Sequence, residues 1–156
     1  MEIMTHSPEQ SMVLAETLAR FTDPGTLILF FGEMGAGKTT FTKGLAKGLG
    51  IEDEVHSPTF TLIHEHSGPK KLCHADLYRL ERSEEIDDLG LEEYIYSDAV
   101  TVVEWSERFG ELPRGYIRID IRRCGDNERL FAFSSDYKDE GFFETVKKEY
   151  LKKCTY

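Results

Sequence analysis

TLILFFGEMGAGKT, residues 26–39, is the stretch of sequence that decides the fold. Residues 26–31 form a short apolar run that is rich in strand-forming side chains, which predicts a strand buried on both faces, as in parallel sheets. Residues 32–39 fit the pattern G-x-x-x-x-G-K-[ST] at every fixed position. Residues 39–49 carry Phe41, Leu45 and Leu49 at helical spacing. A strand, a glycine-rich loop and a helix in this order predict a loop that binds nucleotide phosphates.

Each part of this loop has a physical role. The glycines let successive backbone N–H groups converge on phosphate oxygens, and the new helix presents its unpaired N–H groups to the same anion. Lys38 would neutralise charge on the outer phosphates, and the Thr39 hydroxyl could take one coordination position of Mg²⁺. The candidate nucleotide-binding residues are Glu33, Met34, Gly35, Ala36, Gly37, Lys38, Thr39 and Thr40.

Two acidic residues close strand-like runs elsewhere in the chain. Asp76 follows residues 72–75, and Glu104 follows residues 99–103. The carboxyl ends of parallel strands line the ligand crevice in α/β sheets, so either carboxylate could face the phosphates. Each alone could equally be an ordinary acid at a strand end. Together with Lys38 they form the candidate catalytic set, since hydrolysis requires an acidic group for the metal or the attacking water.

Residues 57–61 carry three hydroxyl side chains. Pro58 favours an extended approach, and Thr59 and Thr61 are expected on one face of a strand over residues 59–66. The hydroxyls of Ser57, Thr59 and Thr61 could sense a γ-phosphate, as switch segments do. Taken alone, the pattern favours an ordinary strand with a polar face.

The remaining pattern predicts one α/β domain over residues 1–156. A helix begins at Ser7, where Gln10 completes a capping box. Strands and helices interleave, which favours a three-layer fold like that of P-loop NTPases, with a central sheet flanked by helices. Two hairpin turns make the sheet mixed, although largely parallel. Besides the elements above, we expect strands over residues 72–76, 99–103, 116–122 and 129–133. We also expect a helical stretch over residues 81–95 that is broken at Gly90, and a helix over residues 141–153.

Composition excludes several classes of protein. Of the 156 residues, 40% are hydrophobic and 12% aromatic, which argues against disorder. The formal net charge of −10 disfavours a free-standing binder of nucleic acid or anionic membranes. No apolar run approaches the ~20 residues of a membrane span, and no signal peptide is visible. Three cysteines without a CxxC pair fit free thiols in a reducing cytoplasm.

Five motifs together resemble one family. They are GEMGAGKTTF (residues 32–41), SPTFTL (57–62), HADLYRL (74–80), LGLEEY (89–94) and VEW (103–105). The first is shared by many ATPases, whereas the other four are far more specific. Their order and spacing, over about residues 7–135, resemble the TsaE family (also called YjeE), small ATPases of bacterial tRNA threonylcarbamoyladenosine synthesis.

The resemblance implies a domain that binds ATP with Mg²⁺ and hydrolyses it slowly. It implies that Thr39 and Glu104 hold the metal, and that Asp76 and residues 57–61 lie beside the γ-phosphate. Family members often carry Gly-Arg in the turn after the strand at residues 116–122. Here that turn reads Gly125-Asp126, so the candidate nucleotide contact is the next arginine, Arg129. The sequence leaves open whether Arg129 or Trp105 touches the nucleotide.

The resemblance also implies partners. TsaD and TsaB transfer the threonylcarbamoyl group to tRNA, and ATP hydrolysis would reset their complex. The tRNA would then be contacted only indirectly. The acidic net charge is consistent with docking on a protein partner.

Two other functions remain open. A small-molecule kinase of the P-loop class could be equally short, but Arg118, Arg122 and Arg123 lie in a strand-like run rather than in a mobile lid. A non-catalytic nucleotide-binding regulatory module is the other alternative, and Asp76 and Glu104 argue against it. His64, His66, Cys73 and His74 could cluster as metal ligands on one hairpin, but ordinary strand residues are favoured.

Overall fold

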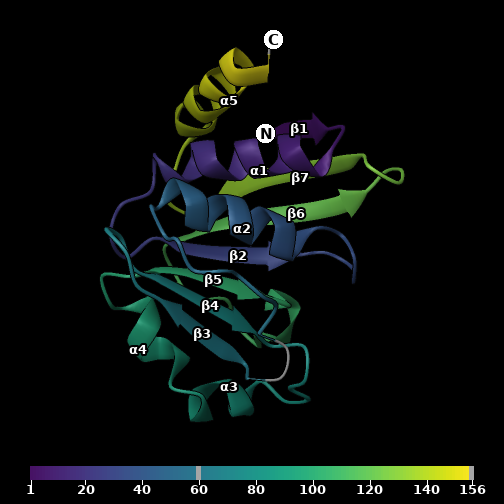
Figure 1. Cartoon of the computed structure of the whole chain (residues 1–156). Helices are drawn as coiled ribbons and strands as arrows, with labels where there is room; N and C mark the ends of the chain where they lie inside the picture. Colours follow the sequence, from purple (N-terminus) through teal and green to yellow (C-terminus); the bar gives the residue numbers. More distant parts are fainter. Residues whose placement is uncertain (59–60, 155–156) are drawn as a thin grey trace.

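The computed structural model describes residues 1–58 and 61–154, which form a seven-stranded sheet in the order β1-β7-β6-β2-β5-β4-β3 (Figure 1). The central strands β6, β2, β5 and β4 are parallel, and antiparallel pairing adds β7, β1 and β3 at the two edges. This confirms the predicted mixed sheet with a parallel centre. The strands are β1 (Glu2–Thr5), β2 (Leu27–Phe31), β3 (Ile63–His66), β4 (Leu72–Asp76), β5 (Val100–Glu104), β6 (Tyr116–Arg123) and β7 (Arg129–Ser135).

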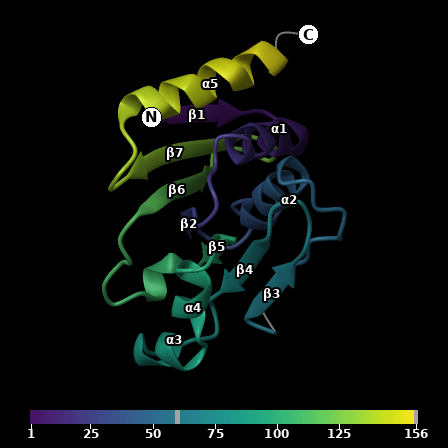
Figure 2. The ribbon, with the colours of Figure 1, turned by 90° about the vertical axis from the view of Figure 1, so that its left-hand side faces the viewer.

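Helices cover both faces of the sheet, as predicted for a three-layer α/β fold. Along β2, Ile28 and Phe30 pack into one core with α1, α2 and α5, whereas Leu27 and Leu29 pack into a second core with α3 and α4. Figure 2 shows α1 and α2 on the side of the sheet away from α3 and α4. The helices are α1 (Pro8–Ala19), α2 (Lys38–Gly48), α3 (Glu84–Asp88), α4 (Leu91–Ile95), the 3₁₀ helix η1 (Ser106–Arg108) and α5 (Glu140–Cys154).

Local chemistry sets the position of α1 and α2. The Ser7 side chain accepts a hydrogen bond from the Gln10 N–H at 3.1 Å, so the predicted cap begins α1. Gly44 in α2 lies so close to α1 that a Cβ on it would be 2.5 Å from the Met12 carbonyl oxygen. Gly48 approaches α1 in the same way. The two helices therefore pack backbone to backbone, which fixes α2 and the loop before it against the sheet.

The structure differs from the sequence prediction in three places. Strand β1 was not predicted, and it pairs with β7 at the edge of the sheet. The helix expected from residue 81 begins only at Glu84, whereas the predicted break at Gly90, which has φ 70°, is confirmed. The strand expected over residues 59–66 begins only at Ile63, because Thr61 lies in a turn and Leu62 has φ 68°. Thr61 therefore cannot present its hydroxyl from a strand face, and Thr59 lies outside the described residues.

The parallel centre brings the two predicted acids to one edge of the sheet. Asp76 is the last residue of β4 and Glu104 the last of β5, and the two are paired in register. The loop after β2 leaves the sheet at the same edge. Within the part of the chain that the structure describes, none of the helices has the length and apolar character needed to cross a membrane.

Candidate functional site

The glycine-rich loop, residues 32–38, joins β2 to α2 and depends on two of its glycines. A Cβ on Gly32 would be 2.6 Å from the Ile121 carbonyl oxygen, so only glycine lets the chain turn this closely beneath β6. Gly37, at φ 111°, is the residue before α2 and adopts a backbone conformation that L side chains rarely take. The turn leads directly into the first turn of α2, whose N–H groups have no partner within the helix.

A cavity of about 400 Å³ opens on this loop. Its walls come from the loop, the start of α2, the ends of β4 and β5, and the residues that follow those strands. All the predicted nucleotide-binding residues line it, together with Ser57, Asp76, Glu104 and Trp105. Thr61 is exposed and is not among the described residues that line the cavity. The lining residues are Glu33, Met34, Gly35, Ala36, Gly37, Lys38, Thr39, Thr40, Ser57, Asp76, Tyr78, Glu104, Trp105 and Arg129.

The Lys38 ammonium is the principal cation of this cavity. The residue is only 5% exposed, and its Nζ has no hydrogen-bond partner among the residues that the structure describes. Nζ lies 3.8 Å from the centroid of the Trp105 ring, a cation–π contact. Burial lowers the pKa of Lys38, and attraction to Glu107, Glu104 and Asp76 opposes this shift only in part. A buried cation with unused donors fits an anionic ligand.

Two buried carboxylates face the same cavity, at 2% exposure for Asp76 and 4% for Glu104. Asp76 accepts hydrogen bonds from the Tyr78 N–H at 2.8 Å and from the Ser57 hydroxyl at 3.4 Å. The Glu104 carboxylate is hydrogen-bonded to Nε2 of His74. Carboxylate and hydroxyl oxygens are the ligands that Mg²⁺ prefers, usually beside phosphate oxygens and water. With Thr39, the cavity therefore has a donor set that fits a metal-bound polyanion.

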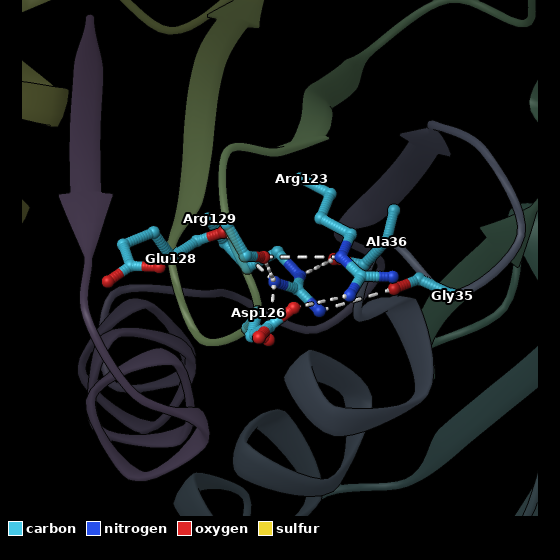
Figure 3. Close-up of polar contacts among 7 residues, drawn as sticks. Gly35, Ala36, Arg123, Asp126, Glu128 and Arg129 are labelled. Atoms are coloured by element: carbon cyan, nitrogen blue, oxygen red, sulfur yellow. Dashed lines mark hydrogen bonds and ion pairs between the residues drawn. The ribbon is translucent and has the colours of Figure 1, made fainter.

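Arg129 fastens the glycine-rich loop to the turn between β6 and β7 (Figure 3). Its Nε donates to the Ala36 carbonyl at 2.8 Å, and its Nη2 to the Gly35 carbonyl at 3.4 Å. Its Nη1 donates to three carbonyls of the turn, those of Gly125, Asp126 and Glu128. The guanidinium thus lies in the cavity wall with most of its donors bound to main-chain oxygens.

Two aromatic side chains, Trp105 and Tyr78, also line the cavity. Trp105 follows β5 at φ 59°, and its ring centroid lies 4.9 Å from that of Tyr78. Tyr78 is partly exposed and Met34 largely exposed, and both line the cavity. The single tryptophan of the chain therefore lines the cavity and also packs against the core on the side of α3 and α4.

Sequence reasoning missed His74, which it treated as an ordinary strand residue. His74 precedes Asp76 by two positions on β4, so the two share a face of the sheet, and this spacing is the signal that could have found it. Among the described residues, no three His, Cys, Asp or Glu side chains are grouped so as to hold a metal ion. His64 and His66 lie on β3, and Cys73 and His74 lie on β4.

A family model described as "Threonylcarbamoyl adenosine biosynthesis protein TsaE" matches residues 5–131. The chain belongs to the TsaE family. A TsaE protein of Bacillus subtilis is 46% identical over 133 residues, which cover 84% of this chain and 83% of that protein. A TsaE protein of Treponema pallidum is 38% identical over 130 residues, 83% of this chain and 96% of that one.

The fold is shared with a solved structure as well. The crystal structure of Bacillus subtilis YdiB superposes with a TM-score of 0.78 at 36% identity, over 99% of this chain and 96% of that one. The residues matched to the TsaE family include every described side chain that lines the cavity, whereas α5 lies beyond the match. Family membership and the cavity therefore rest on the same part of the chain.

Proposed function

We propose that this protein is a Mg²⁺-dependent ATPase that supports the N6-threonylcarbamoyladenosine modification of tRNA. One observation carries the ATPase proposal: a buried ammonium, that of Lys38, lies unpaired among the described residues in a cavity bordered by a glycine-rich loop and two carboxylates. Membership of a family of threonylcarbamoyl adenosine biosynthesis proteins supports the pathway.

Different residues of the cavity have different roles in this proposal. The N–H groups at the start of α2 and the Lys38 ammonium bind the β- and γ-phosphates. Thr39 and Glu104 hold Mg²⁺, which when bound neutralises charge on the phosphate oxygens. Asp76 lies buried at the cavity, where its carboxylate accepts hydrogen bonds from Tyr78 and Ser57, and in this proposal it also accepts a hydrogen bond from the attacking water and orients it. Ser57 lies beside Asp76 and adds a hydroxyl near the γ-phosphate.

The partners proposed for this activity are TsaD and TsaB, the proteins that transfer the threonylcarbamoyl group. ATP hydrolysis would reset their complex, and tRNA would be contacted only through it. A net charge of −10 supports docking on a protein more than direct binding of RNA phosphates. Such a role is carried out in the cytoplasm.

Phosphate release by the purified protein tests the ATPase. Lys38→Ala should lose nearly all turnover of Mg²⁺–ATP while melting as a folded protein. The matched control is Lys43→Ala, because Lys43 is exposed on the same helix and should be dispensable. Unchanged turnover in folded Lys38→Ala would refute the assignment. Transfer of phosphate to a small-molecule acceptor, without release of free phosphate, would favour a kinase instead. Arg118, Arg122 and Arg123 lie in the strand β6, as the sequence predicts.

Binding to purified TsaD and TsaB, with and without ATP, tests the pathway separately. The proposal expects a complex whose affinity depends on the nucleotide. Retained ATPase activity without binding to either protein would leave a general ATPase and remove the proposed role in tRNA modification.

A further inference from the structure

His74 is a buried polar side chain that stability alone does not explain. It is 0% exposed in β4, and its Nδ1 has no hydrogen-bond partner among the described residues. Its Nε2 is hydrogen-bonded to a carboxylate oxygen, Oε2, of Glu104. A buried imidazole with one nitrogen unsatisfied costs free energy, and an apolar side chain of similar size would avoid this cost. The contact with Glu104 is therefore the feature of His74 that needs a functional reason.

The register of the sheet puts this contact at the wall of the cavity. Asp76 pairs with Glu104 across β4 and β5, and His74 pairs with Val102 two residues before the carboxyl ends of these strands. Alternate residues of a strand share a face, so His74, Asp76 and Glu104 all lie on the same face of the sheet. Val102 packs in the core shared with α2, which identifies this face as the one on which the glycine-rich loop enters α2.

The direction of the hydrogen bond follows from the chemistry of the groups. As a metal ligand Glu104 would be an ionised carboxylate, which can only accept, so in that state His74 carries the proton on Nε2 and donates it to Oε2 of Glu104. This occupies one carboxylate oxygen and restrains a side chain that otherwise has three rotatable bonds. Asp76 is restrained differently, because one of its oxygens accepts from the main-chain N–H of Tyr78. Glu104 is thus the acid whose orientation a single side-chain replacement can release.

We propose that His74 is a positioning residue, which holds Glu104 with its second oxygen directed to the cavity as a metal ligand. The inference rests on the proposed function, because it assumes that Glu104 meets Mg²⁺. Hydrogen bonds to the groups that ligate a metal fix their orientation, and losing one typically weakens metal affinity by about 10–100-fold.

Calorimetric titration with the non-hydrolysable analogue adenosine 5′-(β,γ-imido)triphosphate tests this without any turnover. The affinity is measured in EDTA and over a series of Mg²⁺ concentrations. His74→Leu removes the donor at similar size, and His74→Gln is the matched control, because its amide nitrogen reaches about as far as Nε2. For His74→Leu we expect wild-type affinity in EDTA but a half-saturating Mg²⁺ concentration raised at least about tenfold. His74→Gln should stay within about threefold of wild type.

A double-mutant cycle with Glu104→Gln separates positioning from general structure. If His74 acts through Glu104, adding His74→Leu to Glu104→Gln should not weaken Mg²⁺ dependence further. The assignment would be overturned if the two substitutions weakened the Mg²⁺ dependence of analogue binding additively. It would also be overturned if His74→Leu lost the same affinity in EDTA as in Mg²⁺, or if its Mg²⁺ dependence equalled that of the wild type. If His74→Leu does not fold, His74→Asn replaces it, because its amide ends near the Nδ1 position. A wild-type protein without Mg²⁺-dependent binding would instead refute the proposed function itself.

Discussion

Replacing Lys38 by methionine should stabilise the protein while abolishing nucleotide binding. Methionine keeps the length of the side chain and removes the buried ammonium. Unsatisfied buried donors cost about 1–3 kcal/mol, and the cation–π contact with Trp105 offsets about 0.5–2 kcal/mol of this. The lowered pKa of Lys38 shows that burial outweighs attraction to the nearby acids. We therefore expect the free energy of unfolding to rise by about 1 kcal/mol and the melting temperature by about 2–4 °C.

The same group predicts a pH dependence of stability. Because the native pKa of Lys38 lies below its ordinary value of 10.5, the unfolded chain holds this proton more tightly than the native protein does. At pH values below the native pKa of Lys38, the destabilisation caused by burying its charged ammonium is fully present. The free energy of unfolding should then rise as pH climbs from the native pKa of Lys38 towards 10.5, and this increment should be missing in Lys38→Met.

Urea unfolding at several pH values, combined with calorimetric titration of the ATP analogue, measures both effects. The control is Lys43→Met on the exposed side of α2, which should change stability by less than about 0.5 kcal/mol and leave binding intact. A Lys38→Met protein that is less stable than wild type would show that the ammonium is satisfied in the native state. Wild-type affinity in Lys38→Met would remove Lys38 from the binding site.

Other substitutions and reagents test the packing around the site. Gly44→Ala should lower the free energy of unfolding in urea by about 1–3 kcal/mol, since its Cβ would meet the Met12 carbonyl; an unchanged midpoint would contradict the close packing of α1 and α2. Arg129→Lys should weaken binding of the ATP analogue about tenfold, because one ammonium cannot bond both the glycine-rich loop and the β6–β7 turn. Unchanged affinity would show that Arg129 does not position the loop for binding. Burial raises the pKa of Cys73 to about 12, so at pH 8 a thiolate-specific reagent should modify exposed Cys124 at once and Cys73 only after unfolding; rapid native modification of Cys73 would contradict its burial.

The sequence predicted those parts of the site that depend on local pattern. The glycine-rich loop needs backbone conformations that its glycines adopt readily, so the spacing of the glycines in the sequence identifies the loop. Asp76 and Glu104 were found because strand ends are visible as breaks in apolar runs, and parallel pairing brings such ends together.

Features that depend on contacts between residues far apart in the sequence could not be predicted in this way. Strand β1 is short, and what makes it a strand is pairing with β7, near the other end of the chain. The acceptors of Arg129 are main-chain carbonyls, which no residue type reveals. The role proposed for His74 depends on Glu104 in the next strand of the sheet. Leu62 adopts a positive φ, which a leucine in the sequence does not indicate.

A crystal structure of the protein with Mg²⁺ and the imido analogue of ATP tests the central claim most directly. The account predicts phosphates against the N–H groups that open α2, the metal at Thr39 and Glu104, and the Lys38 ammonium bound to a phosphate oxygen rather than stacked on Trp105. Nucleotide bound away from the glycine-rich loop, with Lys38 still on the tryptophan ring, would contradict it.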